Sequence, residues 1–122
     1  MKRSAVWAAS IDLAAIVLFV AIGRNNHREA GNQVLGAAKV AAPFLIAAAA
    51  AWVGGRLWRD PMSVATGLTV WLVTVALGMV LRRVVFDRGT ATAFVIVATV
   101  MLFALFIGWR GLWRWRADRP PG

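Results

Sequence analysis

Four long runs of apolar residues, separated by short polar stretches, make up most of the sequence. The runs cover residues 5–23, 34–55, 62–81 and 91–109. Each is close to the roughly 20 residues that an α-helix needs to cross a hydrocarbon core about 30 Å thick. The polar connections are too short to hold a domain of their own. The pattern therefore predicts four membrane-spanning helices in a single membrane domain, residues 1–122.

The same pattern fixes the fold class. Inside a bilayer every backbone N–H and C=O must be bonded within the protein, and runs of this length satisfy that requirement as helices. Short connections place consecutive helices antiparallel and side by side. We therefore expect an all-α fold, an integral membrane antiparallel four-helix bundle. The first run could instead be a cleaved signal peptide, because Lys2 and Arg3 precede it, but its length and Asp12 favour a membrane helix.

The composition supports a membrane protein and leaves little material for catalysis. Of the 122 residues, 61% are hydrophobic and 16% are charged, against roughly 45–50% and 25% in soluble domains. The mean hydropathy is +0.70. The chain has no cysteine, one histidine and five acidic residues, which excludes disulfides, thiolate metal sites and multi-histidine metal sites. We expect no metal, no cofactor and no enzymatic activity.

Basic residues are distributed unevenly between the two ends of the predicted bundle. Eight lie on the side that carries both termini, and six lie on the other: Lys2, Arg3, Arg56, Arg59, Arg110, Arg114, Arg116 and Arg119 against Arg24, Arg28, Lys39, Arg82, Arg83 and Arg88. Cytoplasmic loops carry the excess of Lys and Arg. The sequence thus predicts a multi-pass plasma-membrane protein with both termini in the cytoplasm. The net charge of +9 is then explained by the basic residues that set the orientation in the membrane, and we expect no nucleic acid partner.

The last predicted helix is followed by a basic tail, residues 110–122, rich in tryptophan and arginine. Indole rings prefer the headgroup level, and each arginine gains about 1 kcal/mol near anionic lipid. We expect this cytoplasmic tail to lie among the headgroups, with anionic lipids as partners. The predicted interfacial anchor consists of Trp109, Arg110, Trp113, Arg114, Trp115 and Arg116.

Asp12 is the most informative polar residue, because it lies about 10 Å inside the first helix at 1.5 Å per residue. A carboxylate at such depth costs roughly 2.5–3.5 kcal/mol on insertion scales. Its neighbours at helical spacing are mostly small: Ala5, Ala8, Ala9, Ala15 and Ile16. Small residues mark a face that packs against another helix. We expect Asp12 to point into the bundle, where desolvation favours its neutral form, either as a proton or cation site or as a structural acid that joins helices.

Two further groups of polar residues are candidates. Pro43 removes the hydrogen-bond partner of the carbonyl of Lys39, so a kink, a carbonyl and an ammonium group coincide in the second helix. This spot could contact a ligand, although a lysine that extends towards the interface past a tolerated proline is the favoured explanation. At the non-cytoplasmic side the candidate cluster is Arg24, His27, Arg28 and Arg82. Cations beside a helix C-terminus are favourable without any function, whereas His27 could relay protons.

The order and spacing of several residues resemble a small prokaryotic membrane family, domain of unknown function 3054. The resemblance spans roughly residues 7–110 and rests on Asp12, Phe19, Gly23, Arg24, His27, Pro43, Phe44, Trp52, Gly78, Arg82, Phe94, Val95, Gly108, Trp109 and Arg110. It implies four transmembrane helices and no established activity.

Two functions are compatible with these features. The first is a non-enzymatic accessory or interaction subunit of a larger membrane complex, or a homo-oligomer, because the loops are minimal and small residues line the helices. The second is a small proton- or cation-coupled transporter or channel that uses Asp12. The architecture is similar to small multidrug-resistance transporters, but their first-helix acid is Glu, and this chain has no Tyr.

Overall fold

A computed structural model describes residues 3–27, 33–86 and 92–117 of the chain. Within these ranges the chain forms α-helices and no strand, which confirms the predicted all-α bundle. The elements are α1 (Arg3–His27), α2 (Gln33–Gly54), a short 3-10 helix η1 (Leu57–Arg59), α3 (Val64–Val84) and α4 (Thr92–Ala117). The helices begin and end within a few residues of the apolar runs, except that α4 continues well past Trp109.

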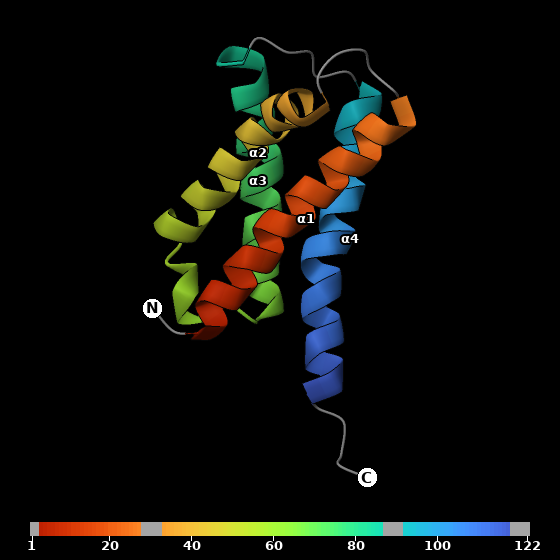
Figure 1. The fold of residues 1–122 in the computed structure, drawn as a ribbon. Coiled ribbons are helices and arrows are strands. Elements are labelled where there is room, and N and C mark those ends of the chain that lie inside the picture. The colour runs from red at the N-terminus through yellow and green to blue at the C-terminus, as the bar shows by residue number, and fades with distance from the viewer. Residues whose placement is uncertain (1–2, 28–32, 87–91, 118–122) are drawn as a thin grey trace.

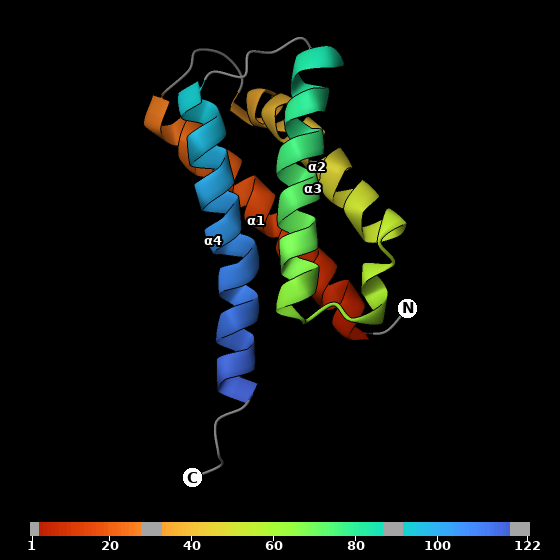
Figure 2. The same ribbon diagram turned by 180° about the vertical axis from the view of Figure 1, so that it is seen from behind.

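The helices alternate in direction. Figure 1 shows α1 running obliquely across the bundle, and Figure 2 shows α3 and α4 standing side by side in front of it. One end of the molecule, at the bottom of both views, contains the beginnings of α1 and α3, the end of α2, η1 and the end of α4. We call this the η1 end. The first and last described residues therefore lie at the same end of the bundle.

The length and composition of the helices fit a membrane protein. Among the described residues, Arg3–Gly23, Val64–Val84 and Thr92–Ala117 are long and apolar enough to cross a bilayer, and α2 supplies a shorter apolar stretch, Ala38–Gly54. The exposed side chains of these helices are largely apolar, including Val17, Leu72, Ile96 and Val100. Apolar surface facing outward is what hydrocarbon surroundings require of a spanning helix.

Small and aromatic residues pack the helices against one another. On α3 the buried positions Gly67, Val70, Thr74 and Gly78 recur at helical spacing and form one stripe. A Cβ atom added at Gly78 would lie only 2.6 Å from Cδ1 of Phe44, so α2 and α3 approach closely there. The rings of Phe19, Phe44 and Phe94 gather with centroids 6.1–6.3 Å apart. These contacts link α1, α2 and α4.

The turn between α2 and α3 is held by local polar contacts. The hydroxyl of Ser63 accepts a hydrogen bond from the backbone N–H of Thr66, which caps α3. The hydroxyl of Thr66 in turn donates to the carbonyl of Asp60. Leu57 and Pro61 are buried, so the turn is packed against the bundle.

Candidate functional site

Asp12 lies on the inner face of α1. Its side chain is fully buried, as are the neighbouring positions Ala5, Ala8 and Ile16. The structure thus places the carboxyl inside the bundle, as the small neighbours predict. The burial of the Asp12 carboxyl and its inward direction both follow from the small residues along α1, because small residues let other helices approach the carboxyl closely.

The partner of Asp12 is Arg110 on α4, 98 positions away in the sequence. Nη1 of Arg110 lies 2.8 Å from Oδ1 of Asp12, and Nη2 lies 2.8 Å from Oδ2. Neither side chain is exposed. Two parallel N–H···O bonds of this length form the bidentate pair that is the strongest arrangement of a guanidinium with a carboxylate.

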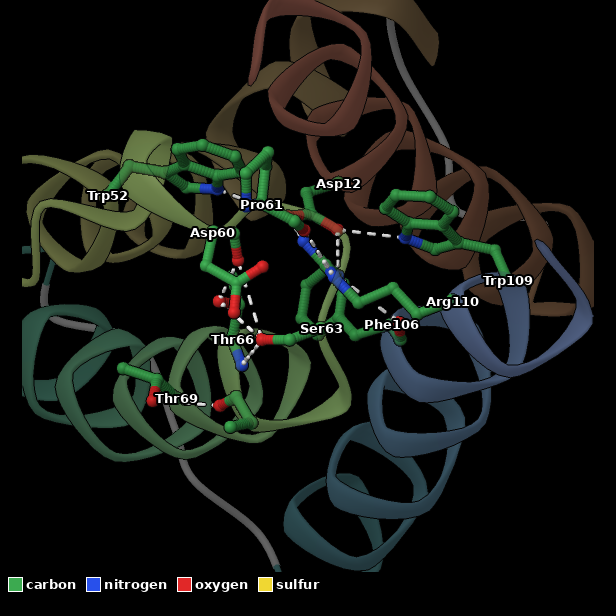
Figure 3. Close-up of polar contacts among 11 residues, drawn as sticks. Asp12, Trp52, Asp60, Pro61, Ser63, Thr66, Thr69, Phe106, Trp109 and Arg110 are labelled. Carbon is green, nitrogen blue, oxygen red and sulfur yellow. Dashed lines mark hydrogen bonds and ion pairs between the residues drawn. The ribbon is translucent and has the colours of Figure 1, made fainter. Parts of the chain in front are cut away.

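Two tryptophans complete the surroundings of the carboxylate. The indole N–H of Trp109 donates to Oδ1 at 3.0 Å, and that of Trp52 donates to Oδ2 at 3.1 Å. Figure 3 shows both rings turned towards Asp12 from opposite sides. Each carboxylate oxygen therefore accepts two hydrogen bonds. These four donors satisfy the polar atoms of a side chain that the fold has removed from solvent.

Two further N–H groups of Arg110 bond to backbone carbonyls. Nε donates to the carbonyl of Pro61 at 3.0 Å, and Nη1 also donates to the carbonyl of Phe106 at 3.2 Å. The guanidinium carbon lies 4.4 Å from the ring centre of Trp109, which adds a cation–π contact. Four of the five N–H groups of Arg110 thus have a partner in this network. Because Pro61 belongs to the α2–α3 turn, that turn is joined to α4.

Helix α3 contributes space to the site. A Cβ atom added at Gly67 would lie 3.0 Å from Cδ of Arg110 and 3.6 Å from its Nη1. A side chain at this position would compete with the guanidinium for room. The site therefore draws on α1 for the acid, on α2 for Trp52, on α3 for space at Gly67, and on α4 for Trp109 and Arg110. Figure 3 shows the acid, both tryptophans and the arginine together.

This geometry corrects part of the predicted interfacial anchor. The sequence assigns Arg110 and Trp109 to the headgroup layer, but Arg110 is fully buried and Trp109 is only partly exposed. Both turn inward because Asp12 offers a charge that must be compensated inside the bundle. Trp113, Arg114, Trp115 and Arg116 are exposed. They belong to the end of α4 and not to a separate tail, since the helix continues to Ala117.

The other candidates lie apart from Asp12. Pro43 is buried within α2 and Lys39 is exposed on the same helix, and neither takes part in the network of Asp12. The guanidinium of Arg82 lies 4.1 Å from the ring centre of Phe94 at the opposite end of the bundle. Arg24 and His27 lie in α1, but their side chains fall outside the described residues, as does Arg28 entirely. Of the predicted non-cytoplasmic cluster, the structure therefore describes the side chain of Arg82 alone.

Sequence reasoning missed the pairing of Asp12 with Arg110 and the role of Trp52. One signal was available: with four antiparallel helices, the start of the first and the end of the last lie at the same end of the bundle. Arg110 follows directly on the last apolar run, so its long side chain can reach back to the depth of Asp12. Within the described residues, no three His, Cys, Asp or Glu side chains gather to hold a metal ion.

Fold and site together define an all-α bundle with helices of membrane-spanning length, closed by a buried ion pair at one end. The chain belongs to the family described as Protein of unknown function (DUF3054), whose model matches residues 9–113. The match includes both Asp12 and Arg110 and confirms the resemblance seen in the sequence. Searches of curated proteins and of solved structures found no match.

Proposed function

We propose that the protein is a small multi-pass protein of the prokaryotic plasma membrane with a non-enzymatic role, as an accessory or interaction subunit of a membrane complex or as a homo-oligomer. The observation that carries this proposal is that both oxygens of the Asp12 carboxylate already accept two hydrogen bonds each. The one acid inside the described helices is committed to holding the bundle together. With the first and last described residues at the η1 end, the excess of basic residues there supports a cytoplasmic orientation of both termini.

The network weighs against Asp12 as a transport site. A carboxylate that takes up and releases a proton or cation needs a lone pair that its cargo can reach. Both oxygens of Asp12 already accept two hydrogen bonds each, from Arg110 and from Trp52 or Trp109, and the side chain has no exposed surface. Opening this site would break a buried ion pair, which costs about 3–5 kcal/mol.

The outer surface supports an interaction role. Within the most apolar segment of each helix, only 17% of α4 is buried inside the bundle, compared with 39% of α1. Its outward face includes Ala104 and Gly108, and nothing lies within 4 Å of a Cβ atom built at Gly108. Small outward residues permit close approach of another helix. Such a face is available either to lipid or to another membrane helix.

Two measurements test the proposal together. The purified chain is reconstituted into vesicles, and proton and Na⁺ flux are compared with protein-free vesicles for wild type, Asp12→Asn and the control Asp60→Asn, which removes an exposed carboxyl. Its mass is also determined after mild extraction from native membranes. We expect no flux above the protein-free background, and a mass that exceeds that of the monomer. Flux that Asp12→Asn abolishes and Asp60→Asn retains would establish transport instead, and a lone monomer would refute the interaction role.

A further inference from the structure

The η1 end carries more arginine than the ion pair uses. Six arginines in the described part of the chain lie there: Arg3, Arg56, Arg59, Arg110, Arg114 and Arg116. Only Arg110 is buried and paired with a carboxylate; the other five are exposed, and Asp60 is the one exposed carboxylate among the described residues. The guanidinium groups of Arg56, Arg59, Arg114 and Arg116 make no hydrogen bond or ion pair with the described residues. Within the described residues, this end therefore presents positive charge that no carboxylate pairs with.

The turn that carries Arg56 and Arg59 has an unusual backbone conformation. Arg56 has φ 51° and ψ 46°, a left-handed conformation that is unfavourable for a residue with a Cβ atom. The turn keeps this conformation because Leu57 is buried beside it and the carbonyl of Pro61 is bonded to Arg110. Non-glycine residues held in this region cluster at sites that bind something. Arg56, Trp58 and Arg59 all point outward from the fixed turn.

The end of α4 has a second group of the same composition. All residues from 111 to 117 are exposed, and the helix continues through them. At 3.6 residues per turn, Trp113 and Trp115 project about 160° apart, and so do Arg114 and Arg116. A helix that lies flat on a membrane places its aromatic and basic residues on separate faces. Here both kinds surround the helix, which fits a helix end that passes upright through the headgroup layer.

Resting on the membrane location proposed above, we propose that the η1 end binds the phosphate groups of anionic phospholipids, through Arg56 and Arg59 on the turn and Arg114 and Arg116 on α4. Guanidinium groups bind phosphate oxygens in bidentate fashion, and Trp58, Trp113 and Trp115 lie beside them at the level where indoles are favoured. The lipid contacts stabilise the α2–α3 turn, whose Pro61 carbonyl accepts a hydrogen bond from Arg110. Lipid binding and the ion pair therefore stabilise the same end of the bundle.

Native mass spectrometry of the full chain tests this directly. The protein is equilibrated in micelles with equal amounts of phosphatidylglycerol and phosphatidylcholine carrying identical acyl chains, and the retained lipids are counted. We expect wild type to retain phosphatidylglycerol in excess. Each double variant, Arg56→Gln with Arg59→Gln and Arg114→Gln with Arg116→Gln, should lower that preference by at least about tenfold, since each arginine contributes about fivefold.

Arg83→Gln is the matched control, because Arg83 is exposed on α3 at the opposite end. We expect it to keep the wild-type preference. Equal retention of the two lipids by wild type would overturn the inference. A loss of about fivefold in Arg83→Gln would overturn it as well, since the same loss for each removed charge would indicate a response to net charge alone. Neither result affects the flux and mass measurements, so failure here is distinguishable from failure of the proposed function.

Discussion

At the scale of single residues, the main feature of the structure is that one buried charge, the carboxylate of Asp12, is compensated by its neighbours. Asp12 alone would be costly inside an apolar bundle. It is compensated by Arg110 and by the indole N–H groups of Trp52 and Trp109, all within 3.1 Å. The inward orientation of Asp12 follows from the alanines around it. The partner does not follow, because the direction of a long side chain at a helix end depends on what the rest of the fold places nearby.

A second buried polar group differs from Asp12, because its substitution is expected to raise the free energy of unfolding. The hydroxyl of Thr74 is fully buried and has no hydrogen-bond partner among the described residues. Thr74→Val removes an unsatisfied polar group at nearly constant volume, and we expect it to raise the free energy of unfolding by about 1 kcal/mol. Titration of the purified protein with SDS measures this change.

Thr66 provides the matched control. It is also buried, but its hydroxyl bonds to Ser63 and to the carbonyl of Asp60. We expect Thr66→Val to lower the free energy of unfolding by about 1 kcal/mol. Equal effects of the two substitutions would mean that hydrogen bonding does not distinguish the two sites.

At the scale of elements, α4 is joined to the bundle at three levels. Arg110 binds Asp12 at the η1 end, Trp71 of α3 donates to the carbonyl of Thr99 at 2.9 Å, and Phe94 packs on Phe19 and Phe44 at the far end. The apolar runs predict the helices well, because a hydrophobic span is a property of local sequence. They miss the extension of α4 to Ala117, since arginines at a membrane boundary look like the end of a helix.

The close approach of α2 and α3 at Gly78 gives a prediction at this scale. A methyl group there would meet the ring of Phe44 at 2.6 Å, and that ring is itself buried and wedged against Phe19 and Phe94. We expect Gly78→Ala to lower the free energy of unfolding by about 1–3 kcal/mol, as measured by SDS titration.

Gly108 on α4 is the comparison, because nothing lies within 4 Å of a Cβ atom built there. We expect Gly108→Ala to be neutral or to stabilise the monomer by up to about 1 kcal/mol, since alanine favours a helix more than glycine does. A loss at Gly108 as large as that at Gly78 would show that the glycine on α3 is not required by packing.

At the scale of the whole molecule, the antiparallel order puts the start of α1 and the end of α4 at the η1 end (Figure 1). The chain has no cysteine, so single cysteines report topology without background. In right-side-out and inverted vesicles, we expect Ser4→Cys and Ala117→Cys to react with an impermeant thiol reagent from the cytoplasmic side, and Val85→Cys from the other side. Labelling of Ser4→Cys and Ala117→Cys from opposite sides would contradict the arrangement.

The most direct test of the account is a double-mutant cycle on Asp12 and Arg110. We predict that Asp12→Asn and Arg110→Gln each lower the free energy of unfolding by about 3–5 kcal/mol. The double variant should lose little more than either single one, giving a coupling energy of at least about 2 kcal/mol. Arg114→Gln combined with Asp12→Asn should be additive, since Arg114 is exposed and unpaired with the acid. Additive effects of Asp12→Asn and Arg110→Gln would contradict the claim that this ion pair closes the bundle.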